Sequence, residues 1–375
     1  MSVKPSVAIA ACSTYTADDL YRAVSAVCYE TDFPKVQDRH VLVKPNILSD
    51  QPPEKAVTTH PEVLRAVIAF LQHLGAIVYV GDSPALQKSS FTGEVSGLRN
   101  VSDEMGARWL DFTSATVKLP CKRSLRSSSF TVTAHVEKMD LIISLPKMKN
   151  HQLMYMTGAV KNMFGLIPSL GKSPYHLRYP GREQFASMLL DLYETVTPEY
   201  SIMDAVTVME GPGPNSGYPK HAGYILGSRD ALALDYTAAL MMEYDPEQLP
   251  QFAAARRRSM LSFASAEGIA YPLLPVSECR IPGFIRIPPA KRNSLLTTAL
   301  GFLYNRRRKQ SKEPKPLFNH EICTLCEACV EICPVSALQN GTSRITVDYR
   351  TCIRCYCCHE ICPADAISIE QREAQ

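Results

Sequence analysis

Eight cysteines near the C-terminal end of the sequence fall into two runs with identical spacing. The runs read Cys323-x-x-Cys326-x-x-Cys329-x-x-x-Cys333-Pro334 and Cys352-x-x-Cys355-x-x-Cys358-x-x-x-Cys362-Pro363. Three thiolates spaced in this way wrap one face of an iron–sulfur cubane, and the proline turns the chain so that the fourth sulfur reaches elsewhere. The runs therefore predict two 4Fe–4S clusters and single-electron chemistry.

The fourth cysteine of each run is expected to serve the other cluster, as it does in bacterial-type two-cluster ferredoxins. The predicted ligand sets are Cys323, Cys326, Cys329 and Cys362 for one cluster, and Cys352, Cys355, Cys358 and Cys333 for the other. Structural zinc fits less well because zinc sites use two separated pairs, and disulfides need an oxidising compartment that nothing in the sequence indicates. Cys357 fits neither run, and we expect it to be a bystander thiol.

Composition and the N-terminal stretch bound the class of protein. The chain has 375 residues, of which 46% are apolar, enough for one large core and a small accessory domain. Its first residues contain only a brief apolar run, too short for a secretory signal. No stretch reaches the roughly 18 apolar residues of a transmembrane segment. We therefore expect a cytoplasmic, reducing and anaerobic setting.

Charge is distributed unevenly along the chain although its net value is only +3. Residues 251–320 contain thirteen lysines and arginines against three glutamates, whereas residues 321–375 contain eight acidic residues against four arginines. The simplest explanation of this uneven charge is that the basic and acidic stretches attract each other within the protein, or that the charged residues form a solvated face. Alternatives are docking on an acidic redox partner, or on a membrane surface through Ser294–Tyr304. No recognition motif accompanies the arginines, so nucleic acid is not an expected partner.

The first 250 residues alternate short apolar strands with helical stretches, which is typical of an α/β domain with a mainly parallel sheet. The clearest helix follows His60, where apolar residues from Val63 to Leu74 recur at helical spacing. It lies between the buried strands His40–Lys44 and Ala76–Val80, which completes a βαβ unit.

The sequence therefore divides into three predicted parts. Residues 1–250 form the large α/β domain, and 251–317 form a basic, Pro-rich connector. Residues 318–375 form a small α+β domain of the two-cluster ferredoxin type, because the two cysteine runs repeat with a period of 29 residues.

Polar residues follow nearly every apolar strand of the large domain. Those with side chains suited to binding are Lys44, Asn46, Asp82, Lys147, Lys149 and His151. Ligands of parallel sheets bind beyond the carboxyl ends of the strands. If these ends converge, they build one pocket with several lysines, His60, His151 and a few carboxylates, which would favour an anionic small molecule such as a carboxylate or phosphate.

The segment Thr157–Gly165 gives a second signal. Small residues just before Lys161 allow a close backbone approach, and the stretch suits a helix N-terminus that faces an anion. The alternative is ordinary helix packing with Lys161 pointing outward. No G-x-G-x-x-G follows a strand and no Walker A motif is present, so classical dinucleotide or nucleotide binding has little support.

Five motifs together resemble one family. They are Val-Lys44-Pro-Asn46, Thr-Thr-His60-Pro, Gly-Asp82-Ser-Pro, Leu-Pro-Lys147-x-Lys149-x-His151 and Thr-Gly-Ala-Val-Lys161-Asn-x-Phe-Gly. The combination resembles the domain of unknown function 362 family, often fused to a two-cluster ferredoxin module, over roughly residues 5–245 and 318–370. The sequence departs from the family pattern at Ser169, where a glycine usually follows Ile-Pro. The binding role expected for Lys44, Asn46, Asp82, Lys147 and Lys149 follows from their positions at the strand ends.

A shorter similarity concerns His151 and Lys161, which lie ten residues apart with a Gly-small pair before the lysine. This arrangement is similar to the lactate racemase family, where a histidine handles a proton or hydride and a lysine tethers a nickel cofactor. The similarity implies an acid/base role for His151 and an anchor or anion clamp at Lys161. We do not predict nickel from it.

Three functions fit these observations. The first is an iron–sulfur oxidoreductase that relays electrons from a low-potential donor to a substrate or cofactor in the α/β domain, with histidine as the proton source. Because no flavin motif is present, this reading implies a further, unidentified cofactor. The second is a ferredoxin-like electron carrier whose large domain is a docking module. The third is a racemase-like or transferase-like enzyme whose clusters are structural or regulatory.

Overall fold

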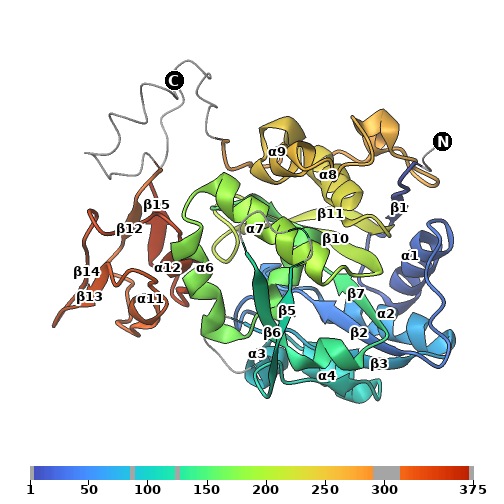
Figure 1. Cartoon of the computed structure of the whole chain (residues 1–375), viewed down its shortest axis with the longest axis horizontal. Helices are drawn as coiled ribbons and strands as arrows, with labels where there is room; N and C mark the ends of the chain where they lie inside the picture. The colour runs from blue at the N-terminus through green and yellow to red at the C-terminus, as the bar shows by residue number, and fades with distance from the viewer. Residues whose placement is uncertain (1–3, 85–88, 122, 124–126, 290–312, 371–375) are drawn as a thin grey trace.

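The computed structural model describes residues 4–84, 89–121, 123, 127–289 and 313–370. A large α/β domain is followed by a small cysteine-rich module, which lies at one side of the large domain beside α6 (Ser173–Arg178) (Figure 1). The stretch Ser294–Tyr304, given above as an alternative membrane contact, lies outside the described residues.

The large domain is organised around a mainly parallel sheet, as predicted. Its main path runs β1 (Ala8–Ala11), β11 (Tyr218–Ser228), β10 (Tyr200–Glu210), β7 (Leu141–Leu145), β2 (His40–Pro45), β3 (Ile77–Val80) and β4 (Arg108–Trp109). The strands from β10 to β4 are parallel, whereas β11 pairs antiparallel with both β1 and β10. The first strand of the chain therefore lies at the sheet edge, outside the parallel set.

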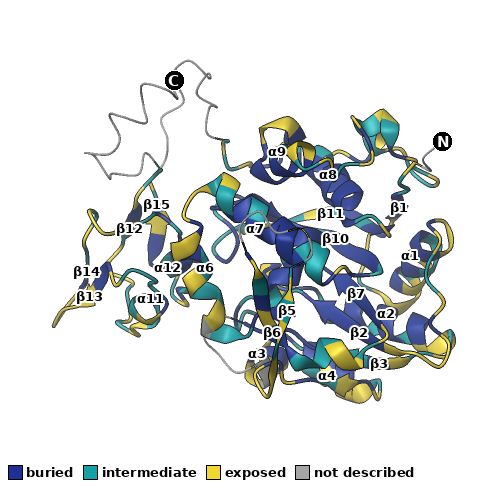
Figure 2. Ribbon diagram, in the orientation of Figure 1, coloured by how far each residue is buried: buried dark blue, intermediate teal, exposed yellow. Residues whose placement is uncertain are grey.

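Helices cover both faces of this sheet, which explains why its central strands are apolar throughout. One face packs against α1 (Ala17–Tyr29), α2 (Pro61–His73) and α4 (Leu98–Glu104). The other packs against α7 (Arg182–Thr195), α8 (Ala231–Met241) and α9 (Pro250–Arg257). Figure 2 shows the central strands as buried. A short helix α3 (Ser89–Val95) and a hairpin of β5 (Thr116–Pro120) and β6 (Ser129–Thr133) complete this part.

Part of the stretch assigned to the connector packs on the large domain. Ile269, Cys279, Ile281 and Phe284 are buried in the same apolar core as α8. Their burial explains why this Pro-rich segment, which has little regular structure, still follows the surface of the domain closely.

The cysteine-rich module consists of two similar halves. Strand β12 (Pro316–Phe318) pairs with β15 (Ile367–Ile369), and β13 (Leu338–Asn340) pairs with β14 (Ile345–Val347). Each half contains one short helix, α11 (Ala328–Glu331) or α12 (Cys357–Ile361). Three residues with positive φ in the first half, Leu325, Glu327 and Ser336, recur 29 positions later as Arg354, Tyr356 and Asp365. The backbone thus repeats with the period of the cysteines.

The loop after β10 attaches the module to the large domain. His359 Nε2 lies 3.0 Å from the carbonyl oxygen of Pro212, Asn215 donates to the carbonyl of Cys362, and Ser216 donates to Asp365. The loop therefore forms a docking surface, because its polar groups are paired with the module.

Candidate functional site between the two domains

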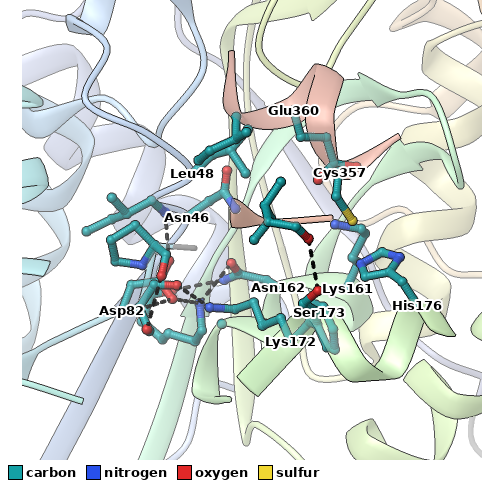
Figure 3. A pocket seen from close by; sticks show the side chains of 18 residues that line it. Asn46, Leu48, Asp82, Lys161, Asn162, Lys172, Ser173, His176, Cys357 and Glu360 are labelled. Carbon is teal, nitrogen blue, oxygen red and sulfur yellow. Dashed lines mark hydrogen bonds and ion pairs between the residues drawn. The ribbon is translucent and has the colours of Figure 1, made fainter. Parts of the chain in front are cut away.

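A cavity of about 90 Å³ lies where the carboxyl ends of β2 and β3 meet the module (Figure 3). The polar residues that line it from the large domain are Lys44, Asn46, Asp82, Ser83, Lys161, Asn162, Lys172, Ser173 and His176. The module closes it with Ile332, Cys357, Glu360 and Ile361. The site is therefore built jointly by the two domains.

Lys44 and Asp82 form a buried ion pair at the base of the cavity. Lys44 lies near the end of β2 and Asp82 follows β3, and Lys44 Nζ lies 2.7 Å from Asp82 Oδ1. Lys44 also donates to Asn162 Oδ1 at 3.1 Å, while the amide of Ile47 donates to Asp82 Oδ2 at 2.6 Å. Burial lowers the pKa of Lys44, and the Asp82 carboxylate opposes this effect. The pair is neutral overall, so it shapes the site more than it attracts an anion.

The helix that carries Lys161 begins against a carboxylate of the protein itself. Helix α5 (Ala159–Asn162) has Asp235 at its N-terminus, and this carboxylate accepts hydrogen bonds from the amides of Ala159 and Val160 at 2.6 and 3.1 Å. A Cβ atom on Gly158 would lie 2.0 Å from Asp235, which explains the small residue there. The anion expected at this helix N-terminus is therefore Asp235. Burial raises the pKa of Asp235 to about 6.

The side chain of Lys161 lines the cavity and does not point outward into solvent (Figure 3). Within the described ranges, its ammonium group forms no hydrogen bond and no ion pair. Burial lowers its pKa, and the nearby Glu360 carboxylate opposes this effect. Lys44 already has a carboxylate partner, so Lys161 is the cation best placed to meet a negatively charged ligand.

Two further residues that line the cavity, Lys172 and His176, were not predicted from the sequence. Lys172 ends η4 (Ser169–Lys172) and donates to the carbonyl of Ser83 at 2.5 Å; burial lowers its pKa to about 7. His176 on α6 stacks on Phe185 with ring centroids 4.5 Å apart, and burial lowers its pKa to about 3. Its Nδ1 is buried and has no hydrogen-bond partner in the described part of the chain. They come from two elements, η4 and α6, and no motif or periodic pattern in the sequence marks either residue as part of a site.

His151 lies behind Glu360 and does not line the cavity. It ends β8 (Lys147–His151), and its Nδ1 accepts the amide hydrogens of Leu153 and Met154 at 3.1 and 3.3 Å. The neutral ring therefore has its proton on Nε2. This atom lies 3.2 Å from Glu360 Oε1, although the two groups are not aligned as a hydrogen bond. Burial lowers the pKa of His151 well below its usual value and raises that of Glu360.

The remaining predicted lysines lie apart from the cavity. Lys147 Nζ is 2.7 Å from Asp204 Oδ2, which also accepts the amide of His60. The His60 ring stacks on Tyr15 with centroids 3.6 Å apart. The residues expected to share one pocket are thus separated. Lys44, Asn46, Asp82 and Lys161 line the cavity, whereas Lys147, Lys149, His60 and His151 do not.

The structure of residues 147–151 explains this division. The polar residues expected beyond the end of the preceding strand themselves form a strand, β8, which pairs with β10 and with β9 (Tyr155–Thr157). This pairing carries Lys147 to Asp204 on β10. Lys149 donates to the carbonyl of Val57, and burial lowers its pKa well below its usual value.

The eight run cysteines surround two small cavities in the module. One is lined by Cys323, Cys326, Cys329 and Cys362, and the other by Cys333, Cys352, Cys355 and Cys358. In the described residues, no three His, Cys, Asp or Glu side chains converge as a site for a single metal ion. Sulfurs spaced around a cavity fit a cluster in which each iron takes one thiolate. The amides of Ala337 and Ala366 lie 3.2 and 3.3 Å from the sulfurs of the fourth cysteines, Cys333 and Cys362.

Cys357 has a more specific position than a bystander thiol. It lines both the large cavity and the cavity of Cys333, Cys352, Cys355 and Cys358. Its thiol donates a hydrogen bond to the Cys355 sulfur, and this bond lowers the pKa of Cys355.

Comparisons with known proteins agree with this description. Residues 41–240 match the family described as "Domain of unknown function (DUF362)". The chain belongs to this family. Residues 315–363 match the 4Fe-4S dicluster domain, so the C-terminal module of this DUF362 protein is an iron–sulfur-binding domain.

A thylakoid-associated protein from Synechocystis is 32% identical over 247 residues, which are 64% of this chain and 74% of that protein. Among solved structures, the lactate racemase apoprotein from Thermoanaerobacterium thermosaccharolyticum has 10% identity and a TM-score of 0.42, covering 63% of this chain and 57% of that one. A Thermotoga maritima protein has 14% identity and a TM-score of 0.37, covering 66% and 60%. The chain thus spans less than two thirds of either solved protein. In the described ranges, no helix is both long and apolar enough to cross a membrane.

Proposed function

We propose that this DUF362 protein is an iron–sulfur oxidoreductase that passes electrons from a low-potential donor to a small anionic molecule in the cavity between its domains. The observation that carries the proposal is the position of α12. This helix contains Cys358, a predicted cluster ligand, and supplies Cys357 and Glu360 to the cavity wall. Electron-carrying groups and a bound molecule would therefore share one short helix.

The cysteine sets fit two 4Fe–4S clusters, which would supply single electrons at low potential when bound. We assign one cluster to Cys323, Cys326, Cys329 and Cys362, and the other to Cys333, Cys352, Cys355 and Cys358. The support is that each set lines its own cavity.

The large domain would bind and orient the anion. Lys161 faces the cavity without a carboxylate partner, and Lys172 lies on the same wall. Glu360 reaches the cavity from the module and is positioned to exchange a proton with the bound molecule. His151, whose Nε2 faces Glu360, would be a positioning residue for that carboxyl group. Lys44, Asn46 and Asp82 shape the base of the site. Lys147 and Lys149 would hold β8 in place, through Asp204 and the carbonyl of Val57 respectively.

The size of the cavity favours a small ligand. A cavity of roughly 150 Å³ is known to hold one benzene ring, whereas this one measures about 90 Å³. An enclosed flavin ring system is therefore disfavoured. Any further cofactor would be small or would enter only in part.

We place the protein in a cytoplasmic and anaerobic setting, because two clusters and free thiols favour reducing conditions. The name of the Synechocystis relative introduces association with a membrane surface as an alternative location. Fractionation of cell extracts under anaerobic conditions would separate the two.

The decisive experiment is anaerobic purification of the full chain, with measurement of iron, acid-labile sulfide and released small molecules. We expect about eight irons per chain and an anion that co-purifies with wild-type protein. Lys161→Met should lose the anion, whereas Lys118→Met, which changes an exposed lysine on β5, should retain it. Turnover of the identified anion should require reduced clusters.

Other outcomes would select the alternatives. An empty cavity beside low-potential clusters would favour the electron carrier. Activity that continues with oxidised clusters would favour the racemase-like or transferase-like enzyme.

A further inference from the structure

The two cysteine sets of the module face different surroundings. Cys357 belongs to the walls of both the ligand cavity and the cavity of Cys333, Cys352, Cys355 and Cys358, which we call the pocket-side set. The ligand cavity shares no lining residue with the cavity of Cys323, Cys326, Cys329 and Cys362, which we call the solvent-side set.

Burial follows the same division. In the second half of the module, Arg354 and Tyr356 on either side of Cys355 are only 3% and 2% exposed, and Tyr356 belongs to the core of the large domain. The equivalent positions of the first half flank Cys326, which is exposed, as is Glu327. The fold therefore turns one half of a pseudo-symmetric module toward the large domain and leaves the other half accessible.

The pocket-side set also has a thiol beside it that its counterpart lacks. Cys357 lines the cavity of this set, where its S–H can donate a hydrogen bond to a ligand sulfur, and the equivalent position in the first half is Ala328, which has no side-chain donor. Hydrogen bonds to ligand sulfurs are one of the levers that set the potential of an iron–sulfur cluster. Donation of this kind stabilises the more negative, reduced form.

Lys161 adds a positive charge next to the same wall. Figure 3 places its side chain beside Cys357, and both line the ligand cavity. A cation in an enclosed site is screened much less by salt than one on the surface. It therefore favours an added electron on the nearer cluster more strongly than on the farther one.

We propose that Cys357 and Lys161 selectively raise the reduction potential of the cluster held by the pocket-side cysteines. This end of the module then passes electrons to the bound molecule, and the end at Cys326 receives them from the partner. The inference rests on the proposed function insofar as both sets must hold clusters. It adds the order in which electrons pass through the two sites. By linkage, an anion bound at Lys161 would make the pocket-side group harder to reduce, and reduction would weaken anion binding by the same factor.

The test is a redox titration of the full-length, anaerobically purified protein, followed by electron paramagnetic resonance. Cys326→Ala, which removes a solvent-side ligand, assigns the two midpoint potentials. Lys161→Met should lower only the pocket-side potential, with about a tenfold change in the reduction equilibrium, or about 59 mV for one electron. Lys161→Arg should largely preserve it. Cys357→Ala should also lower the pocket-side potential, and Cys357→Ser, which retains a donor, should restore part of the change.

Lys55→Met is the matched control. It removes a cation 3.9 Å from Asp365, on the side of the module where Cys362 lies, and should leave the pocket-side potential unchanged. Equal shifts of both potentials in Lys161→Met, or unchanged potentials in both Lys161→Met and Cys357→Ala, would overturn the inference. Since these measurements require only loaded clusters, such a result would leave the proposed electron-transfer function standing. Absence of iron would instead refute that function.

Discussion

His151 Nε2 lies 3.2 Å from Glu360 Oε1, which makes this pair a direct contact between β8 of the large domain and α12 of the iron–sulfur module. Neither atom has a hydrogen-bond partner among the described residues. Glu360 lines the cavity and His151 supports it from behind. The shape of the site therefore depends on how the module docks.

We predict that His151 and Glu360 are energetically coupled. The single changes His151→Ala and Glu360→Ala each leave a buried polar group without its neighbour, so the double variant should cost less stability than the sum of the two. Coupling energies of contacting residues are about 0.5–3 kcal/mol. Urea unfolding of the anaerobic protein, followed by a signal from the large domain, measures this quantity. Strictly additive effects would show that the contact has no energetic role.

We also predict that replacing a cysteine of one set removes the cluster of that set and leaves the other cluster in place. Cys326→Ser should degrade the solvent-side cluster and Cys355→Ser the pocket-side one, so that iron per chain falls by about half in each case. Cys121→Ser, outside the module, should keep the full iron content. Unchanged iron in both run variants would contradict the ligand assignment.

The sequence predicted the mainly parallel sheet correctly, whereas the assignment of the cysteines to two clusters stays a prediction. The spacing of the runs follows from the geometry of a cubane, which is a local requirement, and each predicted set of four lines one cavity. The βαβ unit of β2, α2 and β3 also agrees with prediction, because apolar periodicity directly reports burial.

The composition of the site could not be predicted in the same way. Lys172, His176 and Glu360 reach the cavity because α6 and α12 pack beside each other's domains, as the hydrogen bond from Ser173 to the carbonyl of Ile332 illustrates. Such long-range packing leaves no periodic signal in the chain. Asp235, which occupies the helix N-terminus expected for a ligand, lies about seventy-five residues away from it in sequence.

Asp235 should make stability depend on pH. Its pKa is raised from 3.8 to about 6 by burial, so the folded protein binds a proton more tightly than the unfolded chain does. The contribution of Asp235 to the free energy of unfolding should therefore be fully present below about pH 4. It should be lost, by roughly 3 kcal/mol, as pH rises through about 6. Asp235→Asn, which mimics the neutral form, should remove this part of the pH dependence. Urea unfolding of both proteins at several pH values provides the comparison, and identical profiles would contradict the prediction.

Anion binding should weaken as pH rises through neutrality, because burial lowers the pKa of Lys172 to about 7. The protonated ammonium attracts an anion and the neutral amine does not. His176, whose pKa is lowered to about 3, is neutral throughout this range and does not contribute to the change. Acetate is a suitable probe because its charge is constant between about pH 6 and about pH 8.

Calorimetric titration with acetate should give several-fold weaker binding at the higher pH for the wild-type protein. Lys172→Met should bind more weakly and with a smaller dependence on pH, since this titrating amine is gone. Lys161→Met serves as the comparison for loss of the other cavity cation. If Lys172→Met keeps the full wild-type pH dependence, a different group controls the charge of the cavity, because an amine that is absent cannot titrate.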